Sequence, residues 1–197
     1  MHGDMSNIII TTTNKSRIRT KIIRTYKSSK MRNILVPTDC SKNCNKAELL
    51  GIEMAKLYNS EIHFLHLMQT PVDWVKLDKQ KEKRYPETLK KIGSAKSALR
   101  ELERKAEKEH LKCQTFLQYQ VDTRNILKHS GHFHHDFIIT GSSGTKGTVR
   151  ELFGSNVEQI VRKSNVPVIV VKEDEVHFPF KNIVFVSDFE EDVSEAF

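Results

Sequence analysis

The sequence lacks the features of a secreted or membrane-spanning protein. It has three cysteines in 197 residues, an odd number that gives no disulfide framework, so we expect a reducing, cytoplasmic location. Its longest apolar runs are the size of a strand, such as Val166–Val171, and fall well short of the roughly 20 residues that cross a bilayer. The start of the chain also lacks the apolar block and cleavage site of a secretory signal.

Basic charge is concentrated at the amino-terminal end rather than spread along the chain. The formal net charge is +7, and Met1–Met31 alone holds seven basic residues against one acid, Asp4. That segment therefore carries +6 and leaves +1 for everything after it. Because the remainder has no basic footprint, nucleic acid is not an expected partner of it.

The leader at residues 1–30 is polar and basic, and it shows no sustained helical or strand period. We predict that it is disordered, or that it is translated upstream of a true start at Met31. A nucleic-acid-binding arm and a transit peptide are the alternatives, because the segment is rich in Arg, Lys, Ser and Thr and nearly free of acids.

From Arg32 onward, strand-like and helix-like patterns alternate. Helical spacing of apolar residues predicts helices over about 41–58, 89–106, 123–127 and 154–164. This alternation requires parallel pairing with right-handed crossovers, so we predict an open, five-stranded parallel α/β sheet with helices on both faces. The third strand has one wetter face, which suits a sheet edge. The predicted strands are Asn33–Val36, Ile62–Met68, Thr115–Val121, Phe137–Ile139 and Val166–Val171.

Three glycines lie in the segment that connects the fourth predicted strand to the last predicted helix. Gly141 and Gly144 follow the strand with two residues between them, and Gly154-Ser155 opens the helix. Gly141 permits a tight turn, and Gly144 lets the backbone approach a bound group. The free N–H groups at the helix start favour a phosphate. We therefore predict a phosphate-binding loop rather than simple turns, with added hydroxyl donors from Ser142, Ser143 and Ser155.

This Gly-x2-Gly-x9-Gly-Ser spacing resembles the ATP-binding branch of the universal stress proteins. Ile34–Asp39, His66-Leu67 and Ser164–Val168 also match, and the resemblance covers nearly all of Arg32–Val171. It implies a Rossmann-like, adenine nucleotide alpha hydrolase-like domain over 31–172 that binds ATP, with Mg²⁺ or Mn²⁺ bridging the phosphates. The residues implied at the nucleotide are Pro37, Thr38, Asp39, Leu67, Thr140, Gly141, Ser143, Gly144, Gly154, Ser155, Asn156 and Val157.

The same resemblance implies a role for each of these positions. The strand tip Pro37–Asp39 lies beside the adenosine, with the Asp39 carboxylate as an acceptor. The backbone of Leu67 meets the adenine edge, and Gly141 lies near the ribose. Thr140 stands where a larger apolar residue is commoner. The residues that surround the triphosphate are Gly144, Gly154, Ser155, Asn156 and Val157.

A second resemblance lies within the chain itself. Lys181–Asp188 repeats the pattern of Arg32–Asp39 at a constant offset, which predicts a linker at 173–180 and the truncated start of a second copy at 181–197. In tandem relatives the sister domain covers the edge of the fifth strand. We therefore expect a homodimer, or a tandem pseudo-dimer, through Val166–Val171.

These patterns favour an ATP-binding module that regulates a stress response. The alternatives are a slow ATPase or a nucleotidyl or phosphoryl transferase, and a dimerisation scaffold that binds no nucleotide. No Walker lysine follows the last glycine and no aspartate pair is present for metal catalysis. A dinucleotide oxidoreductase fits the sequence less well, because G-x-G-x-x-G is absent after the first strand. The three glycines argue against the empty scaffold.

Four histidines precede the fourth strand. A metal site would need convergent geometry, and usually help from cysteine or a carboxylate. We therefore predict a solvated loop and assign no metal ligand to the protein. The four are His129, His132, His134 and His135.

Overall fold

The computed structural model describes residues 9–11, 32–41, 44–119, 123–141 and 155–171. The expected linker at 173–180 and second copy at 181–197 lie outside these ranges. In chain order the elements are β1 (Ile9–Thr11), β2 (Asn33–Pro37), α2 (Asn45–Tyr58), β3 (Glu61–Met68), the 3-10 helix η1 (Trp74–Lys76), α3 (Lys79–Glu82), α4 (Pro86–Lys108), β4 (Cys113–Tyr119), α5 (Thr123–His132), β5 (Phe137–Gly141), α7 (Ser155–Lys163) and β6 (Val168–Val171).

The strands form one sheet in the order β1-β6-β5-β2-β3-β4. The five strands from β2 to β6 pair in parallel, which confirms the predicted parallel α/β sheet. β4 lies at an edge, as its polar alternation predicted. The chain builds outward from β2 through β3 to β4, then crosses to the other side of β2 for β5 and β6. The strand order therefore reverses between β2 and β5.

A sixth strand, β1, pairs antiparallel with the outer edge of β6. Ile9 lies opposite Val170, and Thr11 lies opposite Val168. The prediction of a disordered leader is therefore wrong for Ile9–Thr11, and the edge through which we expected a dimer is paired with β1. The reason is that a short apolar run supplies the hydrogen bonds that β6 would otherwise lack. The expected dimer through Val166–Val171 would require β1 to leave this edge.

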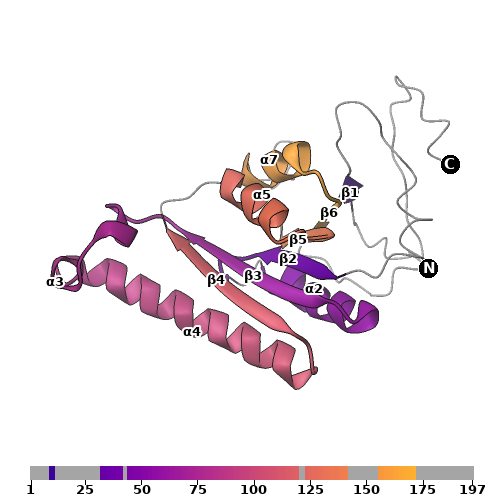
Figure 1. Cartoon of the computed structure of the whole chain (residues 1–197), viewed down its shortest axis with the longest axis horizontal. Helices are drawn as coiled ribbons and strands as arrows, with labels where there is room; N and C mark the ends of the chain where they lie inside the picture. The colour runs from indigo at the N-terminus through magenta and orange to yellow at the C-terminus, as the bar shows by residue number, and fades with distance from the viewer. Residues whose placement is uncertain (1–8, 12–31, 42–43, 120–122, 142–154, 172–197) are drawn as a thin grey trace, which may run out of the picture.

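Helices cover both faces of the sheet, with α2 and α4 on one side and α5 and α7 on the other (Figure 1). Successive strand residues point to opposite faces, so each strand contributes to two cores. Ile62 and Phe64 face α2 and α4, whereas Leu35 and Leu65 face α5 and α7. Because both faces are covered, the inner strands are rich in buried apolar residues.

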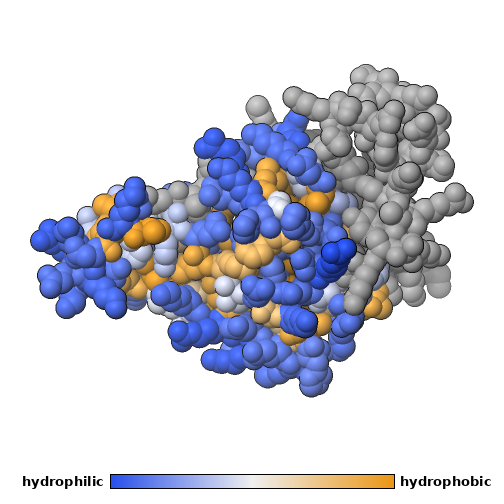
Figure 2. Space-filling view, viewed as in Figure 1, coloured by the Kyte–Doolittle hydropathy of each residue, from blue (hydrophilic) through white to orange (hydrophobic). Residues whose placement is uncertain are grey.

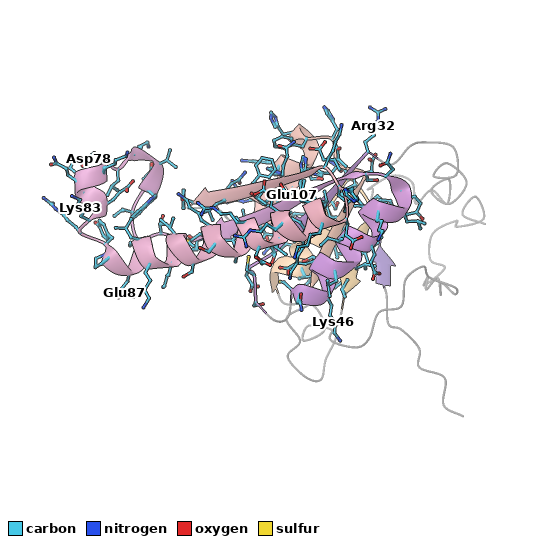
Figure 3. The ribbon with its side chains drawn as sticks, turned by 90° about the horizontal axis from the view of Figure 1, so that it is seen from below. Arg32, Lys46, Asp78, Lys83, Glu87 and Glu107 are labelled. Carbon is cyan, nitrogen blue, oxygen red and sulfur yellow. The ribbon has the colours of Figure 1, made fainter. Side chains whose placement is uncertain are left out.

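The long helix α4 extends past the sheet at its amino-terminal end (Figure 1). Figure 3 shows Glu87 toward that end, near α3, and Glu107 at the other end. Trp74 packs near the start of α4, with its ring 6.2 Å from that of Tyr85. The buried stripe of α4 begins only at Ile92 and continues through Ala95, Leu99, Leu102 and Ala106.

Two residues predicted on apolar helix stripes are exposed. Leu89 of α4 is 36% exposed and Leu57 of α2 is 56% exposed, because each lies at the end of its helix where the sheet no longer covers it. Figure 2 shows a hydrophobic band across the region of β3 and β4, with hydrophilic side chains above and below it. None of the described helices combines the length and the apolar character that a membrane span requires.

Candidate functional site

The carboxyl ends of β2 and β5 meet at the point where the strand order reverses. The register of Ile34 with Phe137 and of Leu35 with Ile138 carries both strands to the same edge. β2 ends at Pro37, and β5 ends at Gly141. Open α/β sheets take their ligands at this kind of position. The structure therefore brings Pro37–Asp39 together with Thr140 and Gly141.

Thr38 is held in place by three hydrogen bonds. Its N–H donates to the Leu65 carbonyl oxygen at 2.9 Å, and its hydroxyl donates to Glu48 Oε1 at 2.5 Å. The same hydroxyl oxygen accepts the Cys40 N–H at 2.8 Å. Glu48 is only 5% exposed, and burial raises the pKa of its carboxyl group, against the effects of the Thr38 bond and of Lys105. This pair fixes the chain where it leaves β2.

Sequence reasoning missed Glu48. It lies in α2 four residues before Ile52 and seven before Ala55, which are both buried. An acid on the buried stripe of a helix is a usable signal, because a charged group is rarely buried unless a partner holds it.

Asp39 is exposed at the tip of β2, where its Oδ1 accepts the Ser41 N–H at 2.8 Å. Partial burial acts to raise the pKa of Asp39, but the hydrogen bonds from Ser41 outweigh it and the pKa is lowered. The carboxylate is therefore charged at neutral pH and faces the edge. The helix predicted to begin near residue 41 begins at Asn45, after Cys44, which makes no side-chain cap bond.

A hollow of about 540 Å³ lies beside these residues, between the ends of β2 and β3 and one side of α4. Its size is within the range of small-molecule sites. Lys90 and Lys91 bring positive charge to it from α4, and sequence reasoning missed both because they belong to the polar face of a distant helix. The lining residues are Asp39, Cys40, His66, Met68, Glu87, Lys90, Lys91, Ser94, Ala95 and Ala98.

Other predicted site residues have different positions. Leu67 is half-buried in β3, in register with Gln118 of β4, and its side chain packs against the core on the α5 and α7 face. Ser155 and Asn156 form the first turn of α7, and Val157 is buried in the same core. Three predicted residues lie outside the described part of the chain: Ser143, Gly144 and Gly154.

The prediction of a solvated histidine loop is wrong for two of the four histidines. His132 and His134 are exposed, but His129 and His135 are 5% and 3% exposed. They lie against His63 of β3, a third buried histidine that sequence reasoning missed. The available signal was a histidine between the apolar residues Ile62 and Phe64 of a central strand. The helical spacing from Ile126 to His129 explains why the latter faces the sheet.

A parallel sheet covered on both faces, with a ligand edge at the reversal of strand order, defines a Rossmann-like α/β domain. The pattern of the Universal stress protein family matches residues 30–172. The chain belongs to this family.

Individual relatives agree with this assignment. A universal stress protein of Methanocaldococcus jannaschii is 27% identical over 170 residues, which cover 86% of this chain and 98% of the relative. The structure of UspA from Lactobacillus plantarum has a TM-score of 0.60 and 22% identity, and covers 73% of this chain and 99% of that chain. A universal stress protein of Archaeoglobus fulgidus, in complex with dAMP, has a TM-score of 0.53 and 19% identity, covering 73% and 100%.

Proposed function

We propose that this chain is a regulatory module that binds ATP at the carboxyl edge of its sheet. The observation that carries the proposal is the position of Asp39, two residues past the end of β2, and of Gly141, at the end of β5. The strand order reverses between these two strands. Preference for an adenine nucleotide is supported by the family member from Archaeoglobus fulgidus that was solved with dAMP.

The proposal gives each part of the nucleotide a distinct partner. The adenosine lies against Pro37–Asp39 and the backbone of Leu67, and the charged Asp39 carboxylate accepts from a hydroxyl group. Gly141, which has no Cβ, admits the ribose. Lys90 and Lys91 line the neighbouring hollow and add favourable potential for the phosphates. Backbone N–H groups hold the phosphates at Ser143, Gly144, Gly154, Ser155, Asn156 and Val157.

A divalent ion enters this proposal through the phosphates rather than through the protein. Mg²⁺ prefers oxygen ligands and keeps several waters, so one or two carboxylates and phosphate oxygens suffice. Within the described residues at this edge, Asp39 and Glu87 are the carboxylates that line the hollow. They fit a Mg²⁺ or Mn²⁺ ion carried by the nucleotide, which neutralises phosphate charge.

The test begins with the nucleotide itself. We expect mass spectrometry to identify an adenine nucleotide released when the purified full chain is denatured, and calorimetry to show ATP binding with Mg²⁺ present. Gly154→Val should abolish binding because its side chain takes the phosphate position. Asp39→Asn should weaken binding by roughly tenfold or more through loss of a charged acceptor.

Gly93→Ala is the matched control, because a Cβ at Gly93 meets nothing within 4 Å. Unchanged ATP affinity in Gly154→Val would contradict the assignment of the phosphate site. Absence of both released nucleotide and ATP affinity would instead favour the dimerisation scaffold, and accumulation of ADP on incubation would favour the slow ATPase.

A further inference from the structure

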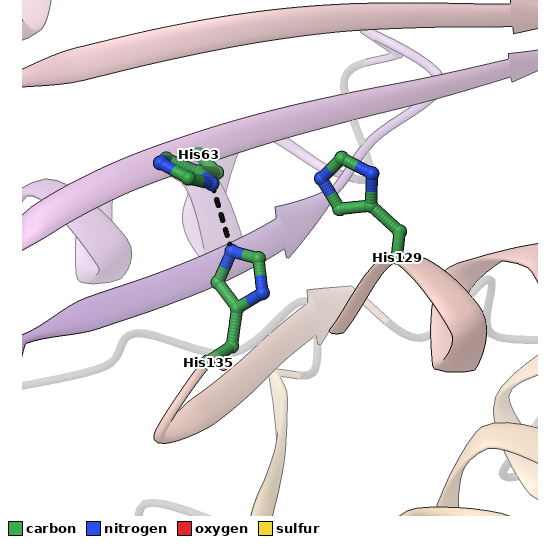
Figure 4. Close-up of side chains that lie close together, drawn as sticks. All are labelled: His63, His129 and His135. Atoms are coloured by element: carbon green, nitrogen blue, oxygen red, sulfur yellow. Dashed lines mark hydrogen bonds between the residues drawn. The ribbon is translucent and has the colours of Figure 1, made fainter. Parts of the chain in front are cut away.

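Three histidines from separate segments converge in the core at the amino ends of the strands. His63 comes from β3, His129 from α5 and His135 from the turn before β5 (Figure 4). Their side chains are 2%, 5% and 3% exposed, respectively. This cluster lies on the α5 and α7 face of the sheet, at the opposite end of the strands from Asp39 and Gly141.

The ring nitrogens of the cluster point toward one another. One nitrogen of each ring lies within 4.8 Å of one nitrogen of each other ring. His63 Nδ1 and His135 Nε2 are 2.9 Å apart, as the dashed line in Figure 4 shows. His129 Nε2 is buried and has no hydrogen-bond partner in the described part of the chain. A buried polar atom in this state requires an explanation.

The outer nitrogen of each ring has a partner of its own. His63 Nε2 lies 3.0 Å from Glu61 Oε1, His135 Nδ1 lies 3.3 Å from the Ser130 carbonyl oxygen, and His129 Nδ1 lies 3.3 Å from the Gln118 amide. The atom of Gln118 at this distance is Nε2, and a half-turn of the amide group presents its oxygen to an outward N–H of His129 instead. Carboxylate, carbonyl and amide partners of this kind orient histidines that bind a metal.

Counting protons shows what these partners imply. A neutral imidazole has one N–H group and one nitrogen lone pair in the plane of the ring. If each ring donates its N–H outward, three lone pairs face the centre of the cluster. Two of them, on His63 and His135, are then only 2.9 Å apart. That arrangement is repulsive unless a cation lies between them.

Aromatic packing alone does not account for this geometry. Phe116 and Phe133 surround the cluster, with ring centroids 5.3 Å from that of His63 in both cases. They explain why the rings are held firmly. They do not explain why polar atoms rather than ring edges meet at the centre, since a buried polar group is costly without a partner.

We propose that His63, His129 and His135 bind one divalent transition ion of the class of Zn²⁺. Neutral imidazole suits Zn²⁺, Co²⁺, Ni²⁺ and Cu²⁺, whereas Mg²⁺ and Ca²⁺ prefer oxygen. With Zn–N bonds of 2.0–2.1 Å, tetrahedral ligands lie about 3.3 Å apart. His63 and His135 therefore separate slightly on binding. Because all three nitrogens lie within 4.8 Å of one another, no other gap needs to close by more than about 1.5 Å.

An open hollow borders the cluster on the side of His129. This hollow of about 370 Å³ reaches His129 beside Phe116, Phe133 and the exposed His132. Water or a small anion can occupy the fourth position of the ion, as at zinc sites with three protein ligands. The ion joins β3 and α5 to the start of β5, and this site is independent of the proposed nucleotide site.

The proposal is tested with the metal alone on the full chain, without a polyhistidine tag. After chelation, we expect calorimetry and elemental analysis to show one Zn²⁺ per chain in the presence of excess Mg²⁺, and Co²⁺ to give the visible spectrum of a tetrahedral site. His63→Gln, His129→Gln and His135→Gln should each lose affinity by more than about a hundredfold. Glu61→Gln removes no metal ligand but replaces the carboxylate that orients His63, so affinity should fall roughly ten- to a hundredfold.

His132→Gln and His134→Gln are matched controls, since both histidines are exposed neighbours of the cluster, and they should bind as the wild type does. Thermal melting of each metal-free variant checks that it folds. If His63→Gln or His135→Gln fails to fold, the Zn²⁺ affinities of His129→Gln and Glu61→Gln decide whether the cluster binds the ion. Absence of stoichiometric binding, or equal loss in the two controls, overturns the proposal.

Discussion

The two faces of the sheet each bury a polar cluster, at opposite ends of the strands. On the α2 and α4 face, the Thr38 hydroxyl and the Glu48 carboxylate form a hydrogen bond of 2.5 Å at the carboxyl end. On the α5 and α7 face, the histidine cluster lies at the amino end. Within the described residues the Thr38 and Glu48 pair leaves no buried polar atom without a partner, whereas the histidine cluster leaves His129 Nε2 without one.

This difference separates a structural cluster from a candidate binding cluster. A buried polar network whose members are all satisfied makes one conformation specific, and here it sets the path of the chain after β2. A network with an unsatisfied member is costly by itself and is better explained by a ligand. Substitutions in each cluster and in the core around it can test the contrast directly.

The largest effects should come from the apolar core and should not depend on the face. Phe64 and Leu65 are adjacent in β3, fully buried, and point to opposite faces. We expect Phe64→Ala to lower the free energy of unfolding by about 3–5 kcal/mol and Leu65→Ala by about 2–5 kcal/mol. Urea denaturation of metal-free protein measures both. A loss below about 1 kcal/mol for Leu65→Ala would show that the α5 and α7 face is loosely packed. The two polar clusters would then lie in unlike cores, and the difference between them would have less meaning.

Thr38→Val should have the next largest effect. The substitution keeps the side-chain volume but removes the donor to Glu48 and the acceptor for the Cys40 N–H. Leaving a buried carboxylate without its donor costs about 1–3 kcal/mol. Urea denaturation at pH 7 provides the measurement, with Thr115→Val on the half-buried edge strand β4 as the control. Equal, small effects in the two variants would mean that the pair does not stabilise the loop.

The sequence was sufficient to predict the parallel sheet and the edge position of β4, because these follow from local patterns. Period-two alternation marks a strand with one wet face, and strand–helix alternation requires parallel crossovers. The pairing of β1 with β6 was not predictable in this way. It joins three leader residues to a strand more than 150 positions away, and no local period records such a contact.

The candidate sites were predictable only where a motif lies within one segment. The tip Pro37–Asp39 and the glycine spacing are local patterns. Glu48 was missed because its partner Thr38 lies on the other side of a turn. His63 was missed because the two histidines beside it come from α5 and from the turn that follows α5. Long-range convergence of single polar residues depends on strand order, which the sequence leaves open.

Glu48 should also make stability depend on pH. Its pKa is raised above the ordinary 4.5 by burial, so above about pH 4.5 the folded protein holds a proton that the unfolded chain releases. The contribution of Glu48 to stability is therefore fully present below this pH and is lost as pH rises through the folded pKa. In urea denaturation, the free energy of unfolding of the wild type should fall between pH 4.5 and 7 relative to that of Glu48→Gln. The exposed Glu53→Gln should show no such difference, and a parallel profile for all three proteins would contradict the raised pKa.

The smallest expected effect is that of His129→Leu in the metal-free protein, and it tests the contrast between the clusters most directly. Leucine removes the buried Nε2 that has no partner in the described residues, which favours folding, and it also removes the contact of Nδ1 with Gln118, which opposes it. We expect these effects to cancel to within about 1 kcal/mol in the free energy of unfolding. Zn²⁺ should then raise the melting temperature of the wild type and of the exposed control His132→Leu, but not that of His129→Leu, because only a native state with a complete site is stabilised by binding. A loss well above 1 kcal/mol without metal would identify His129 as a satisfied structural residue like Thr38, and equal stabilisation of all three proteins by Zn²⁺ would place the ion elsewhere.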